Sequence, residues 1–390
     1  MNENEHRDRR ASGAARVRAV QGLLNDAPVE PAGAAGDRRF VLRSSVEPFP
    51  TSQGDLYLLR SGDADLLIRD ADHDALQLVH ALAGGPLSMS DLATQLERPQ
   101  ELLRSQVDAL DRAGVLSTVG AAVALDPEDA SRFVRQLPYL AEHGAPEALQ
   151  RGLRDTRIVV LGCGGLGSWI IAALAATGIG GFVLVDDDAV ELSNLNRQIL
   201  YATDGLGTPK VEATRAWLRR FDPRIDVQIE GSRIRSAEDV SAISEGSHLI
   251  VLAADSPPYV LGRWVNQAAI AMGIPFVTAG QAPPILKVGP IYWPGRAACF
   301  ACHETLLRTE SGHYDDYVRH AQLHETRVAT LGPASGLIGT AVAMEILQLL
   351  IGAQPATLGG ALTIDLRTLE THRLQVPRDS DCAACQHLFG

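Results

Sequence analysis

Hydrophobic positions in the first third of the chain follow two different spacings. Short apolar runs separated by turn residues predict β-strands at residues 40–49, 54–60 and 64–70. Apolar side chains three and four positions apart predict amphipathic helices at residues 72–85, 88–97 and 99–116. Three strands followed by three helices indicate a winged-helix-like α+β module over residues 39–120.

The rest of the chain alternates buried strands with helices, which is typical of a parallel sheet covered by helices. Strands are predicted at residues 157–162, 182–188, 225–230, 248–255 and 275–280. Helices are predicted at residues 132–144, 167–178, 209–221, 236–244 and 336–352, and a closing hairpin at residues 361–374. The expected fold class is therefore α/β, with a Rossmann-like doubly wound sheet over residues 130–390.

Composition narrows the function classes. Of the 390 residues, 46% are hydrophobic and 21% are charged, which fits a soluble globular protein. Residues 1–38 are rich in Ala, Gly, Pro and Arg without apolar periodicity, so we expect a disordered tail there. The net charge of -12 disfavours nucleic acid as a partner. We find no long apolar run and no secretory signal, and we expect a cytoplasmic protein without a membrane partner.

A glycine-rich turn predicts a nucleotide site. Gly162, Gly164 and Gly167 match the pattern G-x-G-x-x-G between a predicted strand and a predicted helix, and Asp186 ends the next strand. Such glycines let backbone N–H groups approach phosphates, and the acid accepts hydrogen bonds from ribose hydroxyls. A dehydrogenase is the first interpretation that this pattern suggests.

The residues that follow favour phosphate chemistry over hydride transfer. Arg197, Lys210 and Asp255 are expected at the carboxyl ends of the strands, where such folds bind ligands. Cations neutralise charge that grows on phosphate oxygens under attack, and an acid can hold the bridging magnesium. Lys210 is one of only two lysines beside 33 arginines; the other is Lys287.

The ordered motifs D-x-D-x-V-x-x-S-N-L-x-R-Q, G-x-x-K, a strand-ending A-D and two CxxC pairs resemble the ubiquitin-activating-enzyme-like (ThiF-type) superfamily of adenylating enzymes. The resemblance covers roughly residues 130–390 and implies ATP and Mg²⁺ as cofactors. It implies that Gly165 approaches the phosphates and Asp186 holds the ribose, that Ser193, Asn194 and Arg197 contact the nucleotide, that Lys210 contacts phosphate, and that Asp255 binds magnesium. It also implies a homodimer in which Arg135 reaches into the partner's active site.

Two cysteine pairs predict a structural metal. Cys299, Cys302, Cys382 and Cys385 supply four thiolates, the ligand set of a closed tetrahedral zinc site. Zinc would attach the C-terminal hairpin to the main body. A redox CxxC is the alternative.

Thioester chemistry is not expected. The segment 303–329 contains no cysteine, and Cys163 lies inside the glycine turn, where a small buried side chain is the simpler interpretation. Four histidines on that segment suggest either a second metal or, as we prefer, a polar loop that covers substrate.

The first module carries 6 Arg and no Lys against 12 acidic residues over residues 41–117, which opposes DNA binding. Its order of strands and helices resembles the peptide-binding recognition element of enzymes that modify ribosomally made peptides. That resemblance implies that a leader peptide adds as a strand to the sheet edge. A dimerisation or scaffold module is the alternative.

Together these features resemble the microcin C type of peptide-nucleotidylating enzymes. We therefore expect ATP-dependent adenylation of a carboxyl group of a precursor peptide. Two rivals remain: adenylation of a sulfur-carrier protein with a Gly-Gly tail, and a non-catalytic subunit that docks leader peptides.

Overall fold

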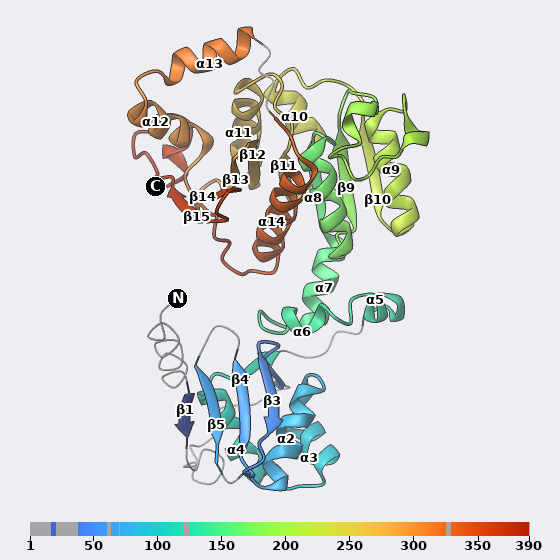
Figure 1. Cartoon of the computed structure of the whole chain (residues 1–390), viewed down its shortest axis with the longest axis vertical. Coiled ribbons are helices and arrows are strands. Elements are labelled where there is room, and N and C mark those ends of the chain that lie inside the picture. Colours follow the sequence, from blue (N-terminus) through green and yellow to red (C-terminus); the bar gives the residue numbers. More distant parts are fainter. Residues whose placement is uncertain are drawn as a thin grey trace, which may run out of the picture. The chain divides into compact units, whose positions relative to one another are not determined.

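The computed structural model describes residues 17–20, 38–60, 64–69, 71–119, 125–324 and 329–389. The chain divides into two compact units, Met1–Arg151 and Gly152–Gly390 (Figure 1). The disordered tail predicted over residues 1–38 lies outside the described residues, except for Val17–Val20, which form strand β1, and Arg38. Residues 130–151, predicted to belong to the second domain, group with unit 1 instead.

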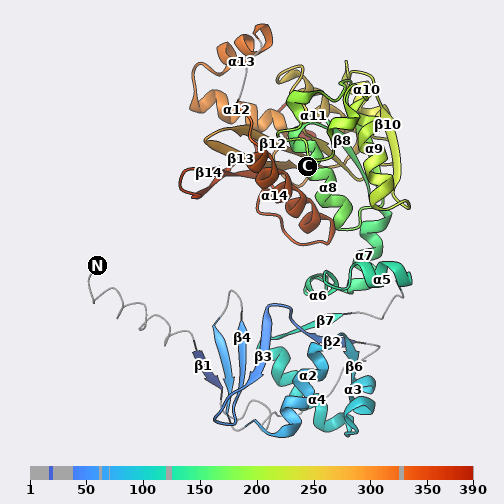
Figure 2. The same cartoon turned by 45° about the vertical axis from the view of Figure 1, so that its right-hand side comes forward.

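The first module of unit 1, as far as Val119, contains two small sheets and three helices among its described residues. Figure 2 shows this arrangement. One sheet has the order β1-β5-β4-β3 and the other the order β6-β2-β7. The strands are β2 (Arg39–Leu42), β3 (Val46–Pro50), β4 (Leu56–Arg60), β5 (Asp65–Ile68), β6 (Leu87–Ser88) and β7 (Leu116–Val119). The helices are α2 (His73–Ala83), α3 (Met89–Leu96) and α4 (Gln100–Arg112).

The prediction of a single strand at residues 40–49 is wrong, because the structure has two strands there, β2 and β3. The chain turns after Leu42, where the N–H of Val46 donates to the carbonyl of Arg43 at 2.9 Å. The turn separates β2 from β3 and sends them into different sheets. Three consecutive polar residues, Arg43, Ser44 and Ser45, interrupt the apolar run at this point, and they were the available signal for the turn.

The helices of unit 1 follow the predicted apolar faces. Leu78, Leu92, Leu103 and Leu110 have no exposed surface and pack in one core with the inner faces of β4 and β5. Asp72 and Ser88 accept hydrogen bonds from backbone N–H groups in the first turns of α2 and α3, which explains where both helices begin.

Three short helices, rather than the one predicted at residues 132–144, follow the first module. They are α5 (Pro127–Arg132), α6 (Leu137–Leu140) and α7 (Pro146–Asp155). Each has a proline at or near its first turn, where proline is tolerated because the N–H has no helical partner. These prolines divide the segment into separate turns of helix.

Unit 2 is built on an eight-stranded sheet of order β10-β9-β8-β11-β12-β13-β14-β15. The strands are β8 (Arg157–Leu161), β9 (Gly181–Val185), β10 (Asp226–Glu230), β11 (Leu249–Leu252), β12 (Phe276–Ala282), β13 (Ile285–Tyr292), β14 (Gly360–Asp365) and β15 (Thr371–Gln375). The first five run parallel and the last three add antiparallel. The α/β class and the Rossmann-like order of the parallel strands are confirmed.

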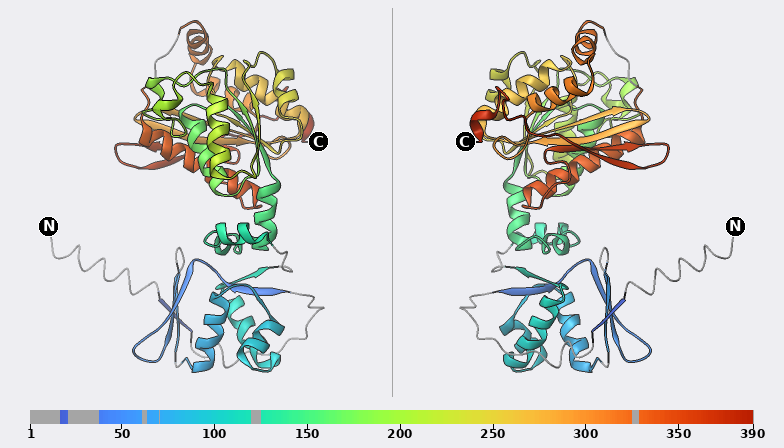
Figure 3. Two further views of the ribbon diagram at one scale, coloured as in Figure 1. Left: turned by 90° about the vertical axis from the view of Figure 1, so that its right-hand side faces the viewer. Right: turned by 90° about the vertical axis from the view of Figure 1, so that its left-hand side faces the viewer.

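Helices cover both faces of this sheet (Figure 3). They are α8 (Gly165–Ala176), α9 (Lys210–Phe221), α10 (Ala237–Ile243), α11 (Val260–Met272) and α14 (Gly332–Leu350). Val159 and Leu161 of β8 pack with α10 and α11 in one core. Helix α14 packs against α8, and it also contacts β12 and β13. By length and composition α14 could cross a membrane, yet more than half of this apolar stretch is buried inside the protein.

The segment after the first CxxC pair is helical, which corrects the prediction of a polar loop. It forms α12 (Phe300–Glu310) and α13 (Tyr314–Leu323). Tyr314 and Val318 bury one side of α13, while its charged residues face outward, so the helix is amphipathic although its sequence is highly polar.

Candidate active site

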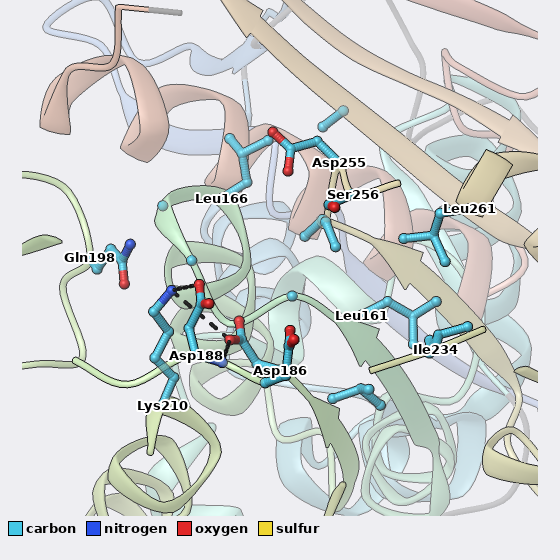
Figure 4. Close-up of a pocket in the computed structure, with 18 of the residues that line it drawn as sticks. Leu161, Leu166, Asp186, Asp188, Gln198, Lys210, Ile234, Asp255, Ser256 and Leu261 are labelled. Atoms are coloured by element: carbon cyan, nitrogen blue, oxygen red, sulfur yellow. Dashed lines mark hydrogen bonds and ion pairs between the residues drawn. The ribbon is translucent and has the colours of Figure 1, made fainter. Parts of the chain in front are cut away.

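A cavity of about 600 Å³ lies at the carboxyl ends of the parallel strands of unit 2. Figure 4 shows most of the residues that line it. Seven residues that were predicted to bind the nucleotide or to act in catalysis line the cavity: Gly162, Gly164, Gly165, Asp186, Arg197, Lys210 and Asp255. The topology therefore brings together side chains from loops that lie nearly a hundred residues apart in sequence.

The glycine turn connects β8 to α8, and its glycines have different roles. Gly162 has φ +98°, and a Cβ there would lie 2.8 Å from the backbone nitrogen of Ala254. Gly164 and Gly165 begin helix α8 at the cavity wall, where free backbone N–H groups attract anions. Gly167 does not line the cavity. A Cβ at Gly167 would lie 1.9 Å from the carbonyl oxygen of Gly162, so this glycine permits close packing of helix on strand.

Asp186 and Lys210, whose side chains are largely buried, form an ion-pair group with the exposed Asp188 (Figure 4). The Lys210 ammonium lies 2.6 Å from a carboxylate oxygen of Asp188 and 3.9 Å from one of Asp186. Asp186 also accepts hydrogen bonds from the backbone N–H groups of Cys163 and Asp188. Burial raises the pKa of Asp186, and the Lys210 ammonium and these hydrogen bonds oppose that rise. Sequence reasoning missed Asp188 as the partner of Lys210, although it lies in the D-D-D run.

Arg197 extends over the glycine turn. Its Cδ would lie 3.4 Å from a Cβ at Gly165, and its Nη1 donates to the carbonyl of Ser193 and to the side chain of Asn196, both at 2.9 Å. Both oxygen acceptors are uncharged, so neither of them neutralises the guanidinium beside the cavity.

Ser193 and Asn194 do not line the cavity. Asn194 is buried, and its side-chain oxygen accepts from the N–H of Glu191, which closes the short 3₁₀ turn Leu192–Asn194. The two residues shape the loop that carries Arg197, and the predicted contact with nucleotide stays a prediction.

Asp255 lies three residues after β11, on the opposite side of the pocket from Lys210 (Figure 4). It is exposed to the cavity, and no described residue is paired with it in a salt bridge. Beside it, Ser256 accepts a hydrogen bond of 2.6 Å from Arg233, which also lines the cavity. Sequence reasoning missed Arg233 because arginine is common in this chain and nothing marks this one.

Gln198 is another cavity residue that sequence reasoning did not single out. Its side chain is buried, and its Oε1 has no hydrogen-bonding partner among the described residues. A buried amide oxygen without a partner is costly, so a ligand group is the natural donor for it. Its position directly after Arg197, in the motif N-R-Q, was the available signal.

Arg135 belongs to unit 1 and is exposed there. Its predicted role across a dimer stays a prediction.

The four predicted metal ligands meet in one buried cluster. The Sγ atoms of Cys299 and Cys382 lie 3.7 Å apart, those of Cys302 and Cys385 3.6 Å, and all four lie within 4.8 Å of one another. Four sulfurs bound tetrahedrally at about 2.3 Å from zinc lie about 3.8 Å apart, so the cluster fits such an ion. The pairs come from α12 and from the C-terminal segment, and a metal would join them.

Cys163 is fully buried, and burial raises the pKa of its thiol well above its usual range. A thiol in this environment stays protonated at neutral pH and is a poor nucleophile. In the segment after the first CxxC, His303 is buried and His313, His320 and His324 are exposed. None of them belongs to a potential metal-binding group among the described residues.

Known proteins resemble this chain over most of its length. Residues 133–384 match the model of the ThiF family. The SAMP-activating enzyme E1 of Haloferax volcanii is 31% identical over 271 residues, which cover 67% of this chain and 91% of that protein. The molybdopterin-synthase adenylyltransferase of Escherichia coli is 28% identical over 236 residues, 60% of this chain and 89% of that protein.

Solved structures support the same fold. The crystal structure of E. coli MccB with ATP superposes with a TM-score of 0.70 at 22% identity, covering 89% of this chain and 99% of MccB. A structure of the same protein, described as the microcin C7 biosynthetic enzyme in complex with N-formylated MccA, gives a TM-score of 0.69. With a family match over most of unit 2 and relatives named as adenylyltransferases, the chain belongs to the ThiF family and is an adenylyltransferase.

Proposed function

We propose that this enzyme uses ATP and Mg²⁺ to activate a carboxyl group of a ribosomally made precursor peptide as an acyl adenylate. One observation carries the proposal: the glycine turn, Asp186, Arg197, Lys210 and Asp255 surround a single cavity. Its volume of about 600 Å³ lies within the usual range for small-molecule and cofactor sites.

The cavity divides by polarity in a way that matches the parts of ATP. Leu161, Ile234 and Leu261 line one side, and apolar side chains there suit a planar base (Figure 4). Asp186 holds the ribose hydroxyls. The glycine turn, Arg197 and Lys210 hold the phosphates, and Lys210 then exchanges part of its contact with Asp188 for phosphate oxygen.

The reaction is an in-line displacement at the α-phosphorus. A carboxylate oxygen of the peptide forms a bond to phosphorus, the bond to the bridging oxygen of the β-phosphate breaks, and pyrophosphate leaves with the electron pair. Arg197 and Lys210 stabilise the charge that grows on the oxygens. Asp255 is the residue that would hold magnesium, which when bound neutralises phosphate charge. Positioning both reactants removes much of the entropic barrier.

Unit 1 supplies a binding edge for the peptide. In its β1-β5-β4-β3 sheet, the outer strand β3 contains Pro48 and Pro50, which lack the N–H groups that strand addition needs. The edge of β5 has no proline, and it already pairs in parallel with β1, from Val17↔Asp65 to Val20↔Ile68. A leader peptide therefore adds at β5 in place of β1.

One further part of the proposal rests on the resemblance to the family, and another on the geometry of the four thiols. Arg135 acts in the active site of a partner copy, so the enzyme works as a homodimer. Zinc binds the four cysteines and holds the C-terminal segment in place, without a catalytic role, because four thiolates leave no open position.

A test is the peptide-dependent exchange of labelled pyrophosphate into ATP. Wild type is expected to exchange, whereas Asp255→Ala and Lys210→Ala are expected to lose at least 100-fold in rate. Asp204→Ala is a matched control, since Asp204 is exposed in the same unit and does not line the cavity. Full activity in both active-site variants would refute the assignment.

A second candidate function is favoured by the relatives, which include a molybdopterin-synthase adenylyltransferase and a SAMP-activating enzyme. It is adenylation of a small carrier protein through a Gly-Gly tail. The two candidates are separated by offering precursor peptides and a Gly-Gly carrier in parallel exchange assays. Exchange with the carrier alone would replace the peptide proposal.

A further inference from the structure

One cationic side chain of the cavity has no part in the reaction described so far. Three lining residues carry a positive charge: Arg197, Lys210 and Arg233. The first two lie between β9 and β10 in the chain, whereas Arg233 lies between β10 and α10. Arg233 is exposed, and no ion pair joins it to any of the described residues. Its charge and the flat faces of its guanidinium are thus available to a ligand.

A hydrogen bond holds this guanidinium across the carboxyl ends of two strands. The Nη2 of Arg233 donates to the hydroxyl oxygen of Ser256 at 2.6 Å. Arg233 follows β10 and Ser256 follows β11, and β9 and β8 lie between these two strands in the sheet. The contact therefore bridges the region where β9 leads into Asp186 and β8 leads into the glycine turn. An exposed arginine otherwise samples many rotamers, and the hydrogen bond favours one of them.

Three buried apolar side chains form one wall of the cavity. They are Leu161, Ile234 and Leu261, which we call the apolar wall, and all three belong to the core on which the cavity lies. Ile234 directly follows Arg233 in the sequence. Figure 4 shows Ser256 on the side of the cavity where the apolar wall lies, with Lys210 on the opposite side. A flat base that packs on this wall has a second face, which is turned away from the core.

Other groups serve the phosphate side of the cavity. Gly165 begins helix α8, where backbone N–H groups attract phosphate. The side-chain atoms nearest to a Cβ placed on Gly165 belong to Ser335, at 3.2 Å, and to Arg197, at 3.4 Å. Arg233 is not among these nearest side chains. Its position in the sequence and its contact with Ser256 group it with the apolar wall instead.

We infer that Arg233 stacks on the adenine base of ATP and that Ser256 positions its guanidinium for this contact; the inference rests on the placement of ATP in the proposed function. An arginine guanidinium is planar and charged, and it stacks on aromatic rings. The base then lies between the apolar wall on one face and Arg233 on the other. The triphosphate extends toward the glycine turn, Arg197 and Lys210. Arg233 is thus a binding residue for the base, and Ser256 is a positioning residue.

Calorimetric titration of the full chain in magnesium buffer tests which part of ATP Arg233 binds. We expect Arg233→Ala to raise the Kd of ATP about five- to tenfold, because the base loses the group that covers its second face. Inorganic tripolyphosphate, measured as a competitor of ATP, carries phosphates without a base. Its inhibition constant should change less than about twofold in Arg233→Ala, whereas it should rise at least about tenfold in Arg197→Ala.

Conservative replacements separate stacking from charge. Arg233→Lys keeps the positive charge but not the planar guanidinium, so its Kd for ATP should lie closer to that of Arg233→Ala than to the wild-type value. Ser256→Ala should raise the Kd of ATP about threefold, and Ser256→Thr, which keeps the hydroxyl, should not. In the Arg233→Ala background Ser256→Ala should add no further loss, because both residues act through one contact.

Arg235→Ala is the matched control. Arg235 is exposed, lies two residues after Arg233 and does not line the cavity, so this variant should bind ATP as wild type does. The variants of Arg233, Ser256 and Arg235 all replace exposed side chains. Their melting temperatures should therefore lie within about 2 °C of the wild-type value, which separates a loss of binding from a loss of folding.

The outcomes separate this inference from the proposed function. Wild-type affinity for ATP in Arg233→Ala would overturn the stacking role, and so would equal losses for ATP and tripolyphosphate or full recovery in Arg233→Lys. Wild-type affinity for ATP in Ser256→Ala would overturn the positioning role. If the wild-type protein itself did not bind ATP, the placement of ATP in the cavity would fail, and the stacking role with it.

Discussion

Substitution of Gly167 by alanine tests whether the third glycine of the nucleotide turn acts on packing rather than on ATP. Gly167 lies in the first turn of α8, directly against the end of β8. An added Cβ would lie 1.9 Å from the carbonyl oxygen of Gly162 and 2.9 Å from its carbonyl carbon. Both atoms belong to backbone, which has no rotamer by which to move away.

The size of the effect follows from that geometry. Contacts of a Cβ below 3.0 Å are essentially never observed, so α8 must move away from β8 by about 1 Å. Overpacking a well-packed core costs about 1–3 kcal/mol, and here the obstacle is backbone at the centre of the sheet. We expect unit 2 to lose about 3 kcal/mol of unfolding free energy. For a unit of this size the melting temperature then falls by roughly 6–12 °C.

Tryptophan fluorescence during urea or thermal unfolding measures this loss. All four tryptophans, Trp169, Trp217, Trp264 and Trp293, belong to unit 2, so the signal reports that unit. Gly152→Ala is the matched control: Gly152 lies within α7, and a Cβ there meets nothing within 4 Å. It should be neutral, or stabilising by up to about 1 kcal/mol.

Gly165→Ala completes the comparison. A Cβ at Gly165 would meet only side-chain atoms, the Ser335 hydroxyl at 3.2 Å and Arg197 Cδ at 3.4 Å, which can shift. It should weaken ATP binding with little loss of stability. The packing argument would be refuted if the unfolding free energy of Gly167→Ala lay within about 0.5 kcal/mol of the wild-type value. That is roughly the spread of ordinary surface substitutions.

Three further predictions concern other parts of unit 2. Cys163→Ser should keep its pyrophosphate-exchange rate within about threefold of wild type, because burial keeps the thiol protonated and unreactive; loss of turnover in a folded variant would indicate covalent catalysis. Purified protein should contain one zinc ion per chain by elemental analysis, and Cys382→Ser should lose that metal and melt at lower temperature; full stability without metal would contradict a structural site. Burial raises the pKa of Asp222, but hydrogen bonds and charge from Arg224 and Arg154 outweigh it and lower the pKa to about 2, so the carboxylate stabilises unit 2 by about 2 kcal/mol above pH 4 and loses that contribution as pH falls through 2. Asp222→Asn should abolish this acid dependence in unfolding titrations, and an unchanged pH profile would refute it.

Much of the nucleotide site was predictable because its signals are local. Gly162, Gly164 and Asp186 lie at the ends of two consecutive strands, so a short stretch of sequence specifies both the turn and the acid. The cysteine pairs are similar, since thiolate ligand spacing is visible without a fold. The break between β2 and β3 was missed although Arg43, Ser44 and Ser45 interrupt the apolar run, because three polar residues also fit an exposed stretch of a single strand. The helices α12 and α13 were missed because many polar residues mask their apolar face.

The amino-acid sequence by itself determined the α/β class, the glycine turn, the acid that follows the second strand and the four thiols, because each depends on neighbours within a few residues or on residue type alone. Only the tertiary structure decided that Lys210 pairs with Asp188 and that Gln198 and Arg233 face the cavity. These relations join residues on different strands and helices. Their burial and charge environment exist only once the sheet has assembled.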